Sequence, residues 1–196
     1  MIARVRSAVR LRSRRGGKVD GRLSPRTEFG SPRVVGVARR RGSWLGVVTT
    51  ARPNGKLAWV KRGDPALRAT RVRYSIHADL SGRWVELRRG GRRIRRLSVA
   101  IGRPGSSTPT GRFAVTDTLR GSRFGPYYGC CILALSGYQP NTPPGWRGGN
   151  RLAIHGTSSP GTIGQAASAG CLRAADRDLR FLMRRVPLGT PVFIRR

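Results

Sequence analysis

Turn-forming residues interrupt this chain at short intervals, and they constrain its fold more than any other feature. The 196 residues include 27 glycines and 13 prolines. Glycine and proline end helices and separate strands, so their abundance favours many short strands over long helices. A chain of this length can bury one good hydrophobic core or two small ones. We therefore expect a mainly β protein.

The first part of the chain has the pattern of a small β domain. Asn54-Gly55 is a hairpin signal. Gly-Ser-Trp-Leu at 42–45 and Lys-Leu-Ala-Trp-Val at 56–60 resemble the middle and closing strands of bacterial SH3-like domains. That resemblance implies an SH3-like barrel over 1–62, followed by a Gly/Pro-containing linker over 63–71. Short apolar runs that we expect to be strands of this barrel occupy 9–12, 27–29, 33–38 and 44–48.

A second pattern begins at Val72 and continues to the C-terminus. Alternating apolar and polar residues up to Ile101 predict a β-meander. At 174–185 the apolar residues recur with helical spacing, acids occupy the first turn and arginines the last, which predicts one amphipathic helix. The run at 191–194 predicts a closing strand. Residues 72–196 are therefore expected to form a second, mainly β domain with one helix near its C-terminus.

A thiol and an imidazole lie near each other in the sequence of this second domain. His155 follows the apolar run Leu-Ala-Ile, which predicts the end of a buried strand, and Cys171 follows Gly170. A cysteine is a nucleophile as its thiolate, and its ordinary pKa of about 8.5 leaves only a few per cent ionised at neutral pH. A neighbouring imidazole base supplies what that chemistry needs. A tight turn at Gly170 can also aim backbone amides at one point, as an oxyanion site requires.

The residues around this pair resemble a known signature. His-Gly-Thr at 155–157, followed by Ser-Ala-Gly-Cys-Leu-Arg at 168–173, resembles the motif of the L,D-transpeptidases, the YkuD-type catalytic domain. Thr-Pro-Thr-Gly-Arg-Phe at 108–113 resembles a second motif of that domain. Ala169 departs from the family, which usually has a second histidine there. The resemblance implies an L,D-transpeptidase-type β-sandwich.

The resemblance also implies a mechanism. Cys171 would form a thioester with a peptidoglycan stem tetrapeptide, releasing D-Ala, and pass the acyl group to an amine that cross-links the wall. His155 would move the protons, the Gly156 carbonyl would orient its ring, and amides near Gly170 would hold the oxyanion. An L,D-carboxypeptidase-type hydrolase, in which water takes the acyl group, is an alternative. No metal and no cofactor is implied.

Further side chains are expected to bind the substrate. Arg173 would hold a substrate carboxylate, with Ser168 and Thr157 beside it. Two long loops, at 121–129 and 137–150, have the length typical of lids. Their aromatic residues, which could equally be surface packing, are candidates for the walls of the cleft: Tyr127, Tyr138 and Trp146.

The net charge of +32, from 40 basic and 8 acidic residues, predicts attraction to polyanions. The arginines are spread along every segment, and neither zinc-ligand spacing nor an RNP-like strand occurs. We therefore expect no specific nucleic-acid partner. For a charge spread in this way, an anionic cell-envelope polymer is as good a target as a nucleic acid. The alternative from another class is a catalytically inert basic module that binds nucleic acid or an anionic wall polymer.

Two further cysteines lie outside the motif that contains Cys171. Cys130 and Cys131 lie in an apolar run and are expected to pack inside a strand, because a disulfide between sequence neighbours is uncommon. His77 is expected to be structural.

Residues 1–15 are too basic to contain the apolar core of a signal peptide. Since the family's substrate lies outside the membrane, we expect an extracytoplasmic protein of the cell wall or envelope, reached through a leader or anchor that this chain lacks.

Overall fold

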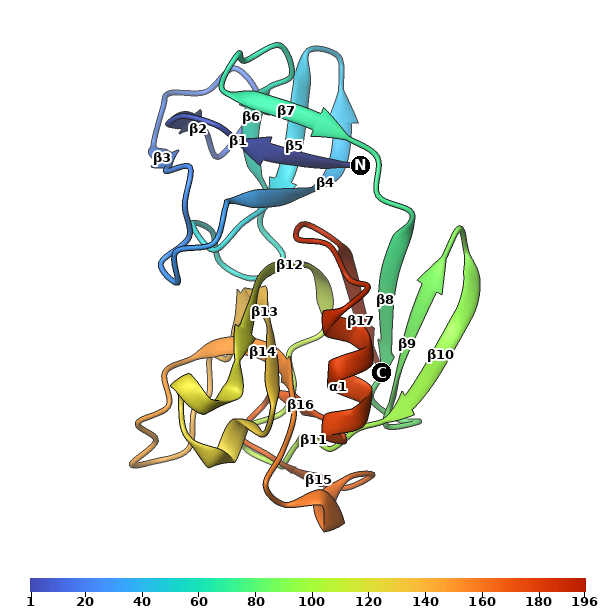
Figure 1. Ribbon diagram of the computed structural model, residues 1–196. Helices are drawn as coiled ribbons and strands as arrows, with labels where there is room; N and C mark the ends of the chain where they lie inside the picture. The colour runs from blue at the N-terminus through green and yellow to red at the C-terminus, as the bar shows by residue number, and fades with distance from the viewer.

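The computed structural model describes all 196 residues and has two β-rich parts, one above the other in Figure 1. The N-terminal part is built on a five-stranded antiparallel sheet with the order β6-β5-β4-β1-β7. The hairpin β2-β3 lies beside it. The strands are β1 (Ile2–Val5), β2 (Val9–Leu11), β3 (Gly21–Leu23), β4 (Val34–Arg41), β5 (Trp44–Val48), β6 (Ala58–Lys61) and β7 (Leu67–Thr70).

The N-terminal part has its own hydrophobic core of 12 buried residues between Ala3 and Ala66. Its assignment as an SH3-like barrel stays a prediction. Two local expectations differ from the structure. Residues 27–29 belong to a loop, because Gly30 turns the chain at φ +87° and Arg26 bridges to Pro32. Residues 67–70, expected in the linker, form β7 because they satisfy the outer backbone edge of β1.

The C-terminal part contains an eight-stranded mixed sheet in the order β10-β9-β8-β17-β12-β13-β14-β16. Strands β8, β9 and β10 form the expected meander, and β17 closes the sheet. A separate two-stranded pair, β11-β15, lies beside β16. The bounds are β8 (Tyr74–Asp79), β9 (Trp84–Arg89), β10 (Arg92–Ser98), β11 (Ile101–Gly102), β12 (Gly111–Arg120), β13 (Cys131–Tyr138), β14 (Arg151–His155), β15 (Ala166–Ser168), β16 (Leu172–Arg173) and β17 (Pro191–Arg195).

Strand β12 joins two halves of this sheet, since its first four residues pair with β17 and its later residues with β13. The only α-helix, α1 (Asp176–Met183), packs against β13 and β14. Leu179 and Leu182 of α1 are fully buried in a core of 20 residues drawn from both halves. The expectation of a mainly β protein with one amphipathic helix near its C-terminus is confirmed. No helix has the length and apolar character needed to cross a membrane.

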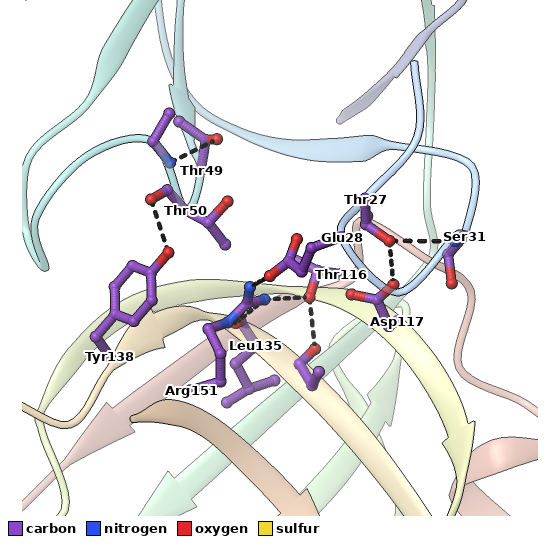
Figure 2. Close-up of polar contacts among 12 residues, drawn as sticks. Thr27, Glu28, Ser31, Thr49, Thr50, Thr116, Asp117, Leu135, Tyr138 and Arg151 are labelled. Carbon is purple, nitrogen blue, oxygen red and sulfur yellow. Dashed lines mark hydrogen bonds and ion pairs between the residues drawn. The ribbon is translucent and has the colours of Figure 1, made fainter. Parts of the chain in front are cut away.

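The two parts contact each other through polar side chains (Figure 2). Thr27 donates a hydrogen bond to the buried carboxylate of Asp117, and Glu28 forms an ion pair with Arg151. Farther along the interface, the Tyr138 hydroxyl donates to the Thr50 carbonyl at 3.0 Å. The loop at 24–33 therefore reaches from the N-terminal sheet to β14, the strand that ends at His155.

Candidate active site

The register of two neighbouring strands brings His155 and Cys171 to one face of the sheet edge. Strands β14 and β16 are parallel, with Ile154 opposite Leu172 and His155 opposite Arg173. This register sets Cys171 beside Ala153. Side chains alternate along a strand, so Ile154 enters the main core, and Ala153 and His155 face the other side, where Cys171 packs in the same small cluster as Ala153.

His155 is held as a neutral base. Its Nδ1 lies 2.6 Å from the Gly156 carbonyl, which can only accept, so Nδ1 carries the proton. Nε2 is buried and has no hydrogen-bond partner. Burial, helped by the nearby Arg173 charge, lowers the pKa of His155 to about 4, against the effect of the Gly156 hydrogen bond. The free lone pair of Nε2 is therefore available to take a proton.

The turn before Cys171 is built around a glycine that cannot be replaced without strain. Gly170 has φ +118°, and a Cβ there would collide with the side chain of Gln139. The Ser168 hydroxyl donates to the Cys171 carbonyl at 2.6 Å and accepts from the Gly170 amide at 3.0 Å. Ser168 is 1% exposed and shapes this turn, and its contact with substrate stays a prediction.

Gln139 is a part of the site that sequence reasoning missed. Its Nε2 lies 3.0 Å from the carbonyls of Ser106 and Ser107 and 3.3 Å from that of Ala169. It thus joins the loop before β12 to the turn that carries the nucleophile. These partners are 30 or more residues away in sequence, so no local signal identifies them.

The thiol of Cys171 is protonated in this state. Burial raises the pKa of Cys171 to about 11, against the effects of a hydrogen bond from Ala153 and the charge of Arg173. The thiol donates toward the Arg151 carbonyl, 3.7 Å away, and no hydrogen bond joins it to His155. The resting pair is accordingly a neutral thiol and a neutral imidazole on one face of the sheet.

Arg173 supplies a cation with free donors at the same edge. It is buried, and its Nε has no partner. Its guanidinium carbon lies 5.7 Å from the centre of the Tyr127 ring. It also lines a pocket of about 280 Å³ together with Arg103, Tyr127 and Trp146. An unpaired buried arginine at a pocket suits a carboxylate ligand.

The aromatic residues fall into two groups. Tyr127 and Trp146 line both the Arg173 pocket and a smaller hollow that contains Cys171. Tyr127 follows the short turn η1 (Gly121–Arg123) in η2 (Pro126–Tyr128), and Tyr128 of the same turn packs on His155 with ring centres 4.9 Å apart. Tyr138 lies elsewhere, at the domain interface with Thr50 (Figure 2), because β13 carries it away from the pocket.

Thr157 and Trp146 lie in the loops that flank the imidazole. The Thr157 hydroxyl accepts from the Ser159 amide at 3.0 Å, just before the turn η3 (Pro160–Thr162), and the side chain is half-buried. The Trp146 Nε1 donates to the Gly149 carbonyl at 2.6 Å, which closes its loop on itself. Nothing in these contacts assigns Thr157 to a ligand.

The structure differs from the expectation for Cys130 and Cys131. They are joined by a disulfide, where we had expected two unbridged residues packed in a strand. Gly129 turns the chain at φ +58°, and β13 begins only at Cys131, so the two side chains do not alternate as strand neighbours would. The Cys130 amide donates to Asp176 at 3.0 Å, which ties this turn to the start of α1. Cys171 is the only free cysteine.

His77 occupies a separate place in the sheet. Its Nε2 lies 3.0 Å from the Ser75 hydroxyl, and its ring stacks on Phe193 with centres 5.0 Å apart. It faces neither the thiol nor a pocket described above. No group of three or more His, Cys, Asp and Glu side chains is close enough to hold a metal ion.

The C-terminal part of the chain matches a known enzyme domain. Residues 73–194, more than half of the chain, match the family of the L,D-transpeptidase catalytic domain, YkuD. The chain therefore belongs to the YkuD family. The match covers both sequence motifs, at 108–113 and 155–173, and leaves the N-terminal domain outside it.

Proteins with similar sequences carry the name of the same family. The chain is 33% identical over 125 residues to L,D-transpeptidase YkuD of Bacillus licheniformis, covering 63% of this chain and 66% of that protein. It is 32% identical over 127 residues to the YkuD protein of Bacillus subtilis, covering 64% and 68%. The matches thus span about two thirds of the length of these relatives.

Solved structures share the fold at low identity. L,D-transpeptidase 3 of Mycobacterium tuberculosis has a TM-score of 0.52 and 15% identity, covering 74% of this chain and 70% of that one. The same protein with a faropenem-derived adduct has a TM-score of 0.54 and 16% identity, covering 83% and 93%. Identities of this size show the fold alone.

Proposed function

We propose that this protein is a cysteine-dependent peptidoglycan L,D-transpeptidase that acts outside the cytoplasm. The observation that carries the proposal is the shared sheet face of Cys171 and His155, with the Gly170 turn and the unpaired Arg173 beside them. Family membership supplies the substrate class, a stem tetrapeptide that ends in D-Ala. Arg173 would bind a carboxylate of that peptide, and Tyr127 and Trp146 would enclose it.

The neutral state of the pair determines how the first step proceeds. Because burial raises the thiol pKa and lowers the imidazole pKa, a free thiolate–imidazolium pair is strongly disfavoured. We infer that proton transfer accompanies attack on the substrate. The thiol turns from the Arg151 carbonyl toward His155 Nε2, which takes its proton as the sulfur attacks the carbonyl carbon. Amides of the Gly170 turn hold the resulting oxyanion.

The remaining steps return the protons. The bond to the terminal D-Ala breaks, and its amine leaves with the proton from His155, which produces a thioester on Cys171. An acceptor amine then attacks this thioester and gives its proton to Nε2. The new peptide bond forms as the carbon–sulfur bond breaks, and the thiol regains its proton. Water in place of the amine would give the hydrolase.

The test is incubation with disaccharide-tetrapeptide, followed by mass spectrometry of the protein and the products. We expect loss of D-Ala, an acyl adduct on Cys171 and cross-linked dimer. A penem should form an adduct on the same residue. Cys171→Ser should make none of these while keeping its circular dichroism spectrum. Dimer formed by Cys171→Ser at the wild-type rate would refute the mechanism, and tripeptide without dimer would identify the hydrolase.

A further inference from the structure

The N-terminal domain carries a basic groove that catalysis does not use. It lies between β1, β7 and the loop at 24–33, and has a volume of about 520 Å³. We call it the arginine groove. No acidic side chain lines it, and none of its arginines takes part in an ion pair. Its lining residues are Arg4, Val5, Arg6, Pro25, Arg26, Pro32 and Arg68.

Strand register concentrates positive charge in this groove. Arg4 on β1 lies directly opposite Arg68 on β7, and Arg6, two residues after Arg4, projects from the same face. Val5 between them is buried in the domain core. Like charges that face each other across a strand pair are destabilising. A bound anion would remove this repulsion.

Two other facing arginine pairs differ in how close an acid lies. Arg88 and Arg93 face each other on β9 and β10, and both form ion pairs with Glu86. Arg10 and Arg22 face each other on β2 and β3, but Arg10 lines a separate pocket that contains Asp64. Arg89 and Arg92 also face each other without an acidic partner, but they line none of the pockets described for this chain. The arginine groove is therefore distinguished by a facing arginine pair that lines a hollow without any acidic side chain.

One wall of the groove is held in place before any ligand binds. Arg33 donates from Nε to the Ser24 carbonyl at 2.7 Å and from Nη2 to the Arg26 carbonyl at 2.6 Å. Arg26 donates from Nη1 to the Gly30 carbonyl at 2.9 Å, which fixes its side chain and leaves its other donors free. A preformed site loses little conformational entropy on binding.

The chemistry of the lining selects the class of ligand. Guanidinium groups bind phosphates through paired N–H donors. The groove contains no aromatic side chain, so it offers no platform on which a nucleic-acid base could stack. We propose that the arginine groove binds a phosphodiester polymer without bases, a polyol phosphate chain of the cell envelope. Only the envelope source rests on the proposed function; the binding itself does not need Cys171.

The test measures binding of a fluorescent glycerol phosphate oligomer by anisotropy at several salt concentrations. Arg4→Gln/Arg68→Gln removes the facing pair in the groove. Arg10→Gln/Arg22→Gln is the matched control, since it removes the same charge from a facing pair of the same domain outside the groove. We expect the groove variant to bind at least about tenfold more weakly and its salt slope to fall by about 1.4, from two lost phosphate contacts. The control should change by less than about twofold.

The outcomes separate this proposal from the catalytic one. Cys171→Ser should bind the oligomer like wild type, so a failed transpeptidase assay leaves the groove proposal intact. Equal losses in the two arginine variants would overturn it, because binding would then follow net charge. Tighter, groove-dependent binding of a single-stranded DNA with the same number of phosphates would also overturn it. Thermal melts of both variants check folding, and removal of facing charges should not lower either Tm.

Discussion

At the scale of single residues, the buried imidazole makes stability depend on pH. His155 has a pKa of about 4 in the folded chain, against about 6.5 for an unfolded histidine. As pH falls, the unfolded chain takes up this proton first, so His155 contributes stability above pH 6.5 that is lost toward pH 4. The loss amounts to about 3 kcal/mol. Urea unfolding at stepped pH should show it.

His155→Gln is the comparison for that measurement, because it removes the titrating group. His77, whose pKa is also lowered by burial, titrates in both proteins and cancels in the difference. Glu86 acts at lower pH: burial raises its pKa, but hydrogen bonds from Arg88 and Arg96 outweigh this and bring it to about 2. Its contribution is lost only below about pH 4.5. Equal slopes for both proteins between pH 6.5 and 5 would contradict the burial of a neutral His155.

The thiol gives a second prediction at this scale. With the pKa of Cys171 near 11, its alkylation by iodoacetamide should accelerate about tenfold per pH unit from 7 to 10. Arg173 stabilises the thiolate, so Arg173→Gln should slow alkylation at every pH in this range. The unfolded chain should instead level off above about pH 8.5. A plateau below pH 8 in the native protein would indicate a preformed thiolate–imidazolium pair and contradict the neutral resting state.

At the scale of elements, the turn at Gly170 can be tested by adding one methyl group. Gly170→Ala places a Cβ against Gln139 at a positive φ, and we expect it to destabilise the fold by at least about 1 kcal/mol and to slow acylation of Cys171. Gly161→Ala is the matched control, since Gly161 has no atom within 4 Å of its Cβ position. Denaturant unfolding and the rate of Cys171 acylation should both be affected in Gly170→Ala and unchanged in Gly161→Ala. Equal stability and equal acylation rates in the two variants would show that the turn tolerates a side chain.

Sequence patterns predicted elements well where the information is local. The two-residue alternation after Val72 and the helical spacing at 174–185 correspond to the meander and to α1, because each depends on which face of one element is buried. Features that depend on distant partners were missed. Strand β7 exists because β1 needs a partner, and Gln139 meets its carbonyls only after folding. The pairing of His155 and Cys171 was anticipated through motif resemblance, whereas their shared face comes from the β14–β16 register.

At the scale of the whole molecule, the interface joins the N-terminal domain to the nucleophile. Glu28 pairs with Arg151, whose guanidinium also donates at 2.8 Å to the Thr116 hydroxyl and to the Leu135 carbonyl. The backbone carbonyl of the same Arg151 accepts from the Cys171 thiol at 3.7 Å. Figure 2 shows the Arg151 guanidinium in contact with both Glu28 and Thr116. Loss of Glu28 therefore leaves a largely buried cation without its only acidic partner.

We expect Glu28→Gln to lower the free energy of unfolding by about 1 kcal/mol and to change the alkylation rate of Cys171 at a fixed pH. Asp20→Asn is the matched control, because the Asp20–Arg52 ion pair has similar exposure but lies within the N-terminal domain. It should affect stability to a comparable degree and leave alkylation of Cys171 unchanged. If Glu28→Gln altered stability alone, the interface would hold the two domains together without reaching the thiol, and Arg151 would be a structural contact only.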